Sequence, residues 1–274
     1  MTDLTLTTLI PLILALFVTG AIAGILSGLL GVGGGIVVVP VLFWVFKFLG
    51  YPPELGMQVA VGSSLLTVAI TALTAAKSHH TRGSVDLGII RRWAPFMALG
   101  ALCGGAVAGL VKGPFLMLVF GTVALLVAWN MALPRTRILA PALPERRGAQ
   151  PAMAAGVGLV SSMMGLGSGT LGVPLMTAFS VPVHRAVGTA AALGLVVGSA
   201  GTLAMLVTGL GVAGRPPLSI GYINLIAVAF VLPLSVLCAP YGTKLAHALD
   251  PIWIKRAFAL FLGATALRML TAAF

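Results

Sequence analysis

Ten long apolar segments divide the sequence, and this pattern is typical of a chain that crosses a membrane several times. They occupy residues 4–30, 35–50, 57–76, 93–111, 114–133, 152–166, 168–182, 186–208, 220–243 and 252–273. Of the 274 residues 59 % are hydrophobic and 8 % charged, whereas roughly a quarter of the residues in a soluble domain are charged. One globular core cannot bury so much apolar surface, and about 20 apolar residues span a bilayer as a helix. We therefore expect an all-α polytopic membrane protein.

The charged residues are confined to short clusters between the apolar segments. The formal net charge is +11, but no basic face with interleaved aromatic residues is formed, so the sequence indicates a lipid bilayer and not nucleic acid as its partner. Cys103 and Cys238 lie inside apolar segments, and no Cys or His spacing suits a metal. We expect no metal and no cofactor, and the oligomeric state is not determined by the sequence.

A basic, proline-containing linker separates two related halves. The linker covers residues 134–151, between a first transmembrane repeat at 1–133 and a second at 152–274. The motif GILSGLLGVGGGIVVVP, which starts at Gly24, matches GLVSSMMGLGSGTLGVP, which starts at Gly158. Downstream, the segment AVGSS from Ala60 matches AVGTA from Ala186. Matching blocks in the same order predict an internal duplication.

Loop charges predict that the two repeats have opposite orientations. The loop 77–92 carries four Lys or Arg residues and the linker is also basic, so both are expected on the cytoplasmic side. The loop 209–219 is the counterpart of 77–92 but contains only Arg215, which places it outside. We therefore expect inverted-topology repeats of about four to five transmembrane or re-entrant helices each. The short segments 152–166 and 168–182 fit either two crossings or a re-entrant hairpin.

Two glycine-rich blocks carry the strongest indication of function. Each glycine costs a helix up to about 1 kcal/mol relative to alanine, so GVGGG from Gly31 and GLGSG from Gly165 predict helix breaks. Within a membrane a break is tolerated only where protein or a water-filled cavity surrounds it. Helices that restart after the breaks present free N–H groups and a positive dipole end, which suits an anion. The alternative is close helix packing, which we assign to the stripe Gly20, Gly24 and Gly28.

Hydroxyl side chains within the apolar segments support a polar path. They are Ser27, Ser63, Ser64, Thr67, Thr71, Thr74, Ser161, Ser162, Ser168, Thr170 and Thr189. Such hydroxyls also bond to their own helix or to a neighbouring helix, and we favour that interpretation for Thr71 and Thr74. The candidate substrate-binding residues are Gly31, Gly33, Gly34, Gly35, Ser63, Ser64, Gly165, Gly167, Ser168, Gly169, Thr170 and Thr189.

Cations at segment ends have two possible roles. Lys77, His79, His184 and Arg185 lie at predicted cytoplasmic mouths, where they either fix topology or form a vestibule that attracts anions. All five acidic residues are predicted in loops or at termini, so a carboxylate proton relay within the membrane is not expected. An inside-negative potential favours anion exit by about 2.3 kcal/mol per charge per 100 mV. No catalytic set can be assembled, so the chain is not expected to be an enzyme.

The two glycine blocks and the AVGSSL and AVGTAA segments resemble those of the TauE/SafE family of sulfite exporters. The residues that match its motif are Gly31, Gly33, Gly35, Pro40, Gly165, Gly167, Gly169 and Pro174. The resemblance implies a multi-pass carrier of the bacterial inner membrane that moves sulfite, sulfonates or related compounds. Ser168 departs from the pattern, because the first half has Gly34 at that position.

The leading hypothesis is export of a small sulfur-containing anion through a site at the interface of two inverted repeats. Two alternatives stay open. One is a cation-coupled importer of a sulfur compound or small organic acid, with backbone carbonyls of the broken helices holding Na⁺. The other is a membrane scaffold whose glycines serve only to pack helices.

Overall fold

The chain folds into an all-helical bundle, as the sequence predicts. The computed structural model describes residues 6–132, 138–144, 148–248 and 251–273, and the predicted linker 134–151 therefore lies partly outside the described residues. In this part of the chain there are ten helices: α1 (Leu6–Leu30), α2 (Gly35–Phe48), α3 (Pro53–His80), α4 (Leu87–Leu110), α5 (Gly113–Ala132), α6 (Ala149–Met163), α7 (Gly169–Ala178), α8 (Val183–Thr208), α9 (Leu225–Ala248) and α10 (Pro251–Ala272). The strands β1 (Ser219–Ile220) and β2 (Ile223–Asn224) form a short antiparallel hairpin before α9.

Within the described residues, six helices are long and apolar enough to cross a membrane: α1, α3, α4, α5, α8 and α9. Leu14, Leu126 and Leu260 are more than half exposed, as expected for side chains that face lipid and not water. The all-α polytopic class is thereby confirmed. The helices α2, α6 and α7 have 14, 15 and 10 residues, which is short of the length of a full span.

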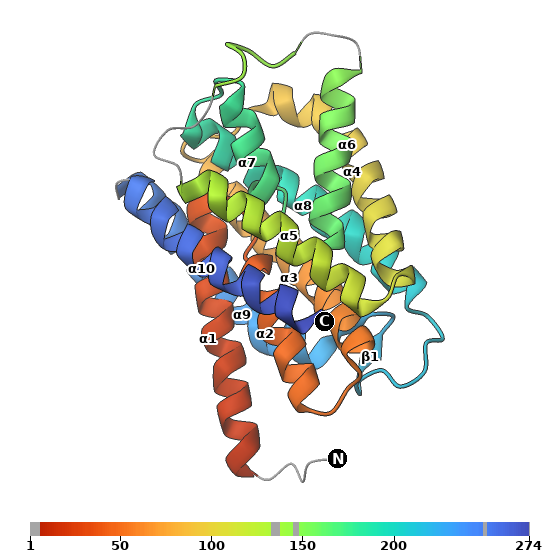
Figure 1. Ribbon diagram of the computed structural model, residues 1–274. Helices are drawn as coiled ribbons and strands as arrows, with labels where there is room; N and C mark the ends of the chain where they lie inside the picture. The colour runs from red at the N-terminus through yellow and green to blue at the C-terminus, as the bar shows by residue number, and fades with distance from the viewer. Residues whose placement is uncertain (1–5, 133–137, 145–147, 249–250, 274) are drawn as a thin grey trace.

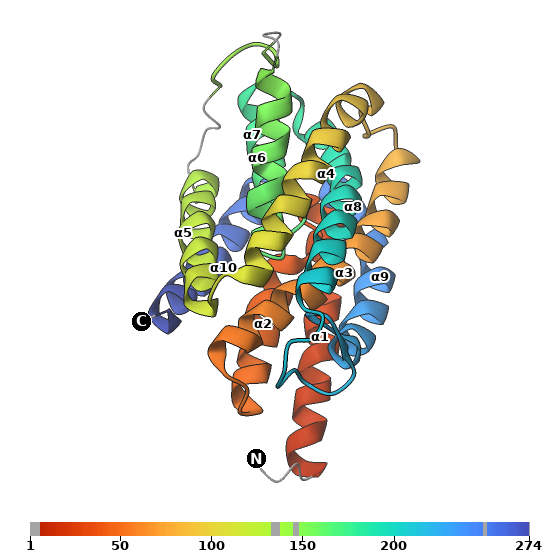
Figure 2. The same ribbon diagram turned by 90° about the vertical axis from the view of Figure 1, so that its right-hand side faces the viewer.

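The helices of the two halves pack on each other in a reciprocal way. α1 lies along α9, and α6, which follows the linker as α1 follows the N-terminus, lies along α4. α3 and α8 contact each other and pack between these two pairs. α5 and α10 pack together and run obliquely across one side of the bundle (Figure 1). In the view turned by 90° the short helix α2 and the pair α6 and α7 occupy different heights of the bundle (Figure 2).

Glycines fix these pairs at matching positions. A Cβ on Gly24 would overlap the carbonyl of Ser235, and one on Gly158 would overlap the carbonyl of Met97. In the reverse direction, Gly242 lies against the carbonyl of Ile25 and Gly104 against that of Leu159. Since Ile25 and Leu159 are both one residue after an aligned glycine, the two helix pairs share one packing. The opposite orientation of the repeats relative to a membrane stays a prediction.

The connecting loops gather at two ends of the bundle. Residues 138–144 and the loop between α3 and α4 lie at one end, whereas the loop between α2 and α3 and the hairpin β1–β2 lie at the other (Figures 1 and 2). The basic loop 77–92 thus lies at the same end as residues 138–144 of the predicted linker. The candidate site lies between these ends, where α1, α2, α6 and α7 are interrupted.

Candidate functional site

The two glycine blocks form helix breaks that touch each other. α1 ends at Leu30 and α2 begins at Gly35, while α6 ends at Met163 and α7 begins at Gly169. The backbone N–H of Gly167 donates to the carbonyl of Val32 over 3.0 Å, which ties one break to the other. All residues of both breaks are buried. The structure therefore brings the predicted glycines of the two halves into one place.

The contact between the breaks is reciprocal as well. A Cβ on Gly35 would overlap the carbonyl of Gly165, and a Cβ on Gly169 would overlap the carbonyl of Gly31. Because Gly35 and Gly169 are the first residues of α2 and α7, the N-termini of two helices converge here. The N–H groups at the start of a helix have no acceptor one turn back within that helix, although here the N–H of Val37 donates to the carbonyl of Gly34, and each N-terminus carries a partial positive charge.

The difference between Gly34 and Ser168 has a backbone cause. Gly34 precedes α2 with φ of 77°, in the left-handed region that a side chain rarely adopts. Ser168 precedes α7 with φ of −62° and ψ of −20°, a conformation open to any L-residue. Its hydroxyl donates to the carbonyl of Ala190 on α8 over 2.6 Å. The two breaks are thus similar in position but differ in local conformation.

Four buried hydroxyls beside the breaks lack a hydrogen-bond partner among the described residues: Ser27, Ser161, Ser162 and Thr170. None of them is more than 2 % exposed. Ser27 and Ser161 occupy aligned positions at the ends of α1 and α6, and Thr170 lies in the first turn of α7. Buried polar groups are nearly always paired, so a cluster of unpaired donors beside two helix N-termini is a feature to be explained. Of these four, only Thr170 was among the candidate substrate-binding residues.

The other candidate hydroxyls are already hydrogen-bonded to the backbone. Ser63 Oγ accepts from the N–H of Asn224 at 2.8 Å, and Thr189 Oγ1 accepts from the N–H of Asp86 at 2.9 Å. Ser64 Oγ donates to the carbonyl of Gly165 over 2.7 Å. Ser63 and Thr189 hold the starts of α9 and α4, and Ser64 holds the second break. Their hydroxyls therefore position the elements that form the site.

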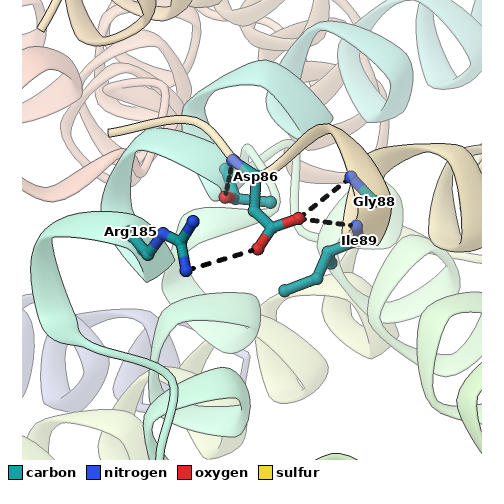
Figure 3. Close-up of polar contacts among 5 residues, drawn as sticks. Asp86, Gly88, Ile89 and Arg185 are labelled. Atoms are coloured by element: carbon teal, nitrogen blue, oxygen red, sulfur yellow. Dashed lines mark hydrogen bonds and ion pairs between the residues drawn. The ribbon is translucent and has the colours of Figure 1, made fainter. Parts of the chain in front are cut away.

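The start of α4 shows how this positioning works (Figure 3). Asp86 Oδ1 accepts from the N–H groups of Gly88 and Ile89 and so caps the helix. Its other oxygen, Oδ2, lies 3.9 Å from Arg185 Nη1 on α8. Asn224 plays the same part before α9, because its Oδ1 accepts from the N–H of Ala227.

The predicted vestibule residues divide into two groups. Lys77, His184 and Arg185 are exposed. His79 is only 1 % exposed, and its Nε2 lies 2.9 Å from the carbonyl oxygen of Gly28 on α1. Since a carbonyl only accepts, this nitrogen carries the proton and donates.

Two further features of the described residues bear on ligand binding. Among the described residues no group of three His, Cys, Asp or Glu side chains could hold a metal ion. A cavity of about 660 Å³ lies between α1, α2 and α9, with Leu16, Phe46 and Phe230 in its wall. Its lining is mostly apolar, so it offers few donors to an anion.

Tyr222, in the hairpin, donates to the carbonyl of Gly109, and burial raises the pKa of its phenol.

Residues 16–269 match the Sulfite exporter TauE/SafE family. The chain belongs to this family. It is 31 % identical to a probable membrane transporter protein of Haemophilus influenzae over 94 % of this chain and 97 % of that protein. A probable membrane transporter protein of Methanocaldococcus jannaschii is 26 % identical over 96 % of both chains. No solved structure matches the chain. The resemblance seen in the glycine motifs is confirmed, and the chain is a multi-pass membrane transporter of the TauE/SafE family.

Proposed function

We propose that this TauE/SafE transporter exports a small sulfur-containing anion, sulfite or an organosulfonate, across the bacterial inner membrane. The anion binds where the two helix breaks meet. The observation that carries this proposal is the convergence of two helix N-termini, those of α2 and α7, at one buried contact. Backbone N–H groups at a helix N-terminus bind anions without any cationic side chain.

The hydroxyls beside the breaks support the same ligand. Ser161, Ser162 and Thr170 are buried donors without partners among the described residues, and an oxyanion accepts several hydrogen bonds at once. Hydrogen bonds to a charged group are about twice as strong as those between neutral groups. The acids Glu54 and Asp86 lie at the starts of α3 and α4, so neither repels an anion at the breaks.

The membrane potential supplies enough energy for export. An inside-negative potential favours the exit of one negative charge by about 2.3 kcal/mol per 100 mV. The proposal therefore needs no proton-carrying carboxylate in the membrane. In the structure the breaks are packed too closely for an anion to lie between them, so binding requires the two breaks to separate.

The test is flux of sulfite and short sulfonates from liposomes that contain the purified protein, under an imposed potential. We expect efflux that rises with the potential and is absent from protein-free liposomes. No potential-dependent flux of any sulfur anion would overturn the proposed substrate. Uptake that depends on a Na⁺ gradient would instead support a cation-coupled importer, and the absence of all flux from folded protein would support a scaffold.

A further inference from the structure

One stripe of α3 carries polar side chains through the interior of the bundle. Ser63, Thr67, Thr71 and His79 lie on it with Ala75 between the last two, at steps of four residues, so the stripe turns around the helix axis by about 40° at each step. Each of these polar residues is at most 1 % exposed. At about 1.5 Å per residue the stripe extends roughly 24 Å from Ser63 to His79. It joins the level of the breaks, where Val68 contacts Gly33, to the end of α3.

The related helix α8 repeats only the first residue of this stripe. Ala60 aligns with Ala186, a constant offset of 126, so Ser63 corresponds to the polar Thr189, whereas Thr67, Thr71 and His79 correspond to positions 193, 197 and 205. These positions hold Leu193, Val197 and Met205, which are buried and apolar. Duplication followed by packing alone gives no reason for polar residues in one copy only, because buried polar groups cost free energy that apolar ones do not.

Ser235 of α9 and the backbone carbonyl of Gly28 of α1 contact the stripe, and together with its polar residues they form what we call the polar column. Thr71 Oγ1 lies 2.9 Å from Ser235 Oγ of α9, and His79 Nε2 lies 2.9 Å from the carbonyl of Gly28 of α1. Gly24 of α1 packs on the backbone of Ser235 as Gly158 of α6 packs on that of Met97. In the second half the pair that corresponds to Thr71 and Ser235 is therefore Val197 and Met97, both apolar.

We propose that the anion reaches the breaks along this polar column, through the half of the molecule formed by α1, α3 and α9. This inference rests on the proposed function and adds that the route is asymmetric. Only one hydroxyl proton is needed for the contact between Thr71 and Ser235, so the other is available to a passing oxyanion. Ser27, buried on α1, is a further donor. The apolar counterparts offer an anion nothing, and a buried charge without partners is strongly disfavoured.

The column is closed in this structure. Gly24 and Gly28 hold α1 against α9, and the contact between His79 and Gly28 holds α3 against α1. His79 belongs to the end of α3 that carries the loop to α4, which is predicted to be cytoplasmic. Opening of this three-helix contact would give a cytoplasmic anion access to the breaks from the side required for export.

The first test compares sulfite efflux from liposomes for the wild type, Thr71→Val and Ser235→Ala. Removing a hydrogen bond to the anion should lower the rate roughly tenfold or more. Val197→Thr adds a hydroxyl on the apolar side, and Thr208→Val removes one that bonds its own helix at Ala204; both should leave the rate unchanged. Normal flux in Thr71→Val and Ser235→Ala would overturn the column and leave the proposed function standing. Absence of flux in the wild type would overturn the proposed function itself.

The second test measures whether a probe can reach the column and does not rely on a transport rate. Ser235→Cys is made in a chain whose Cys103 and Cys238 are replaced by alanine, and a sulfonate-bearing methanethiosulfonate is applied from the side of His79. We expect labelling that ethanesulfonate slows. The same experiment with Met97→Cys should give no labelling. Equal labelling of the two cysteines, or none at Ser235→Cys, would contradict a route in the first half.

Discussion

Gly33 and Gly167 lie against each other where the two helix breaks meet. A Cβ on Gly33 would be 3.3 Å from Gly167 Cα, and a Cβ on Gly167 would be 3.2 Å from Gly33 Cα. Each glycine comes from a different half of the chain. The backbones of the two halves thus touch directly, which only a residue without a side chain allows.

Gly33→Ala should destabilise the protein strongly. Gly33 has φ of 77°, and its new methyl carbon would lie 2.6 Å from Val68 Cγ1. The backbone conformation alone costs an L-residue about 1–2 kcal/mol, and the overlap adds to this. Gly156→Ala is the matched control, because Gly156 is helical with open space around it. Thermal unfolding in detergent should show a lower midpoint for Gly33→Ala and an unchanged or higher one for Gly156→Ala. Equal midpoints would contradict the close contact.

Ser161→Ala, Ser162→Ala and Thr170→Val should separate transport from stability. Each removes a buried hydroxyl that has no partner in the described structure. An unsatisfied buried polar group costs about 1–3 kcal/mol, so these variants should be as stable as the wild type or more so. Anion flux should nevertheless fall, because donors to the substrate are lost. If flux is kept while stability rises, these hydroxyls do not bind the substrate.

The helix breaks could be predicted because glycine acts on its own segment of backbone. GVGGG and GLGSG lower helix stability locally, and the structure interrupts the helices at those residues. Helix limits were less predictable: the apolar segment 57–76 marks only the middle of α3, which begins at Pro53 and ends at His80. Hydropathy does not register polar first and last turns. The segment 220–243 likewise starts in the β-hairpin, since Ile220 and Ile223 are as apolar as residues of α9.

The partners of the hydroxyls could not be predicted. Thr189 accepts from a residue 103 positions away, and Ser63 from one 161 positions away. A hydroxyl that holds a distant helix start and one that faces a ligand look the same in a sequence, because only the tertiary fold supplies the partner. The unpaired Ser161 and the paired Ser63 illustrate this difference.

Ser63→Ala and Thr189→Val should destabilise the protein to a similar extent. Each leaves one buried or half-buried backbone N–H, that of Asn224 or of Asp86, without its acceptor. The expected loss is about 1–2 kcal/mol for each variant. Ser63→Thr and Thr189→Ser keep the hydroxyl and serve as controls in the same thermal unfolding experiment. A stability loss in only one of the two halves would mean that the two helix starts are not held in equivalent ways.

Asp86→Ala should be more harmful than Asp86→Asn, because the cap of α4 matters more than its ion pair. The ion pair with Arg185 is long, at 3.9 Å, and the Arg185 side chain is 57 % exposed, so its removal should cost at most about 1 kcal/mol. Asparagine keeps the capping oxygen, as Asn224 does at the start of α9. Alanine loses it, at a cost of about 0.5–2 kcal/mol. Arg185→Ala should therefore lower stability by about as much as Asp86→Asn does. Because salt screens the ion pair, the stability loss of each of these two variants relative to the wild type should shrink as salt concentration rises. If Asp86→Asn were as unstable as Asp86→Ala, the charge and not the cap would hold the start of α4 against α8.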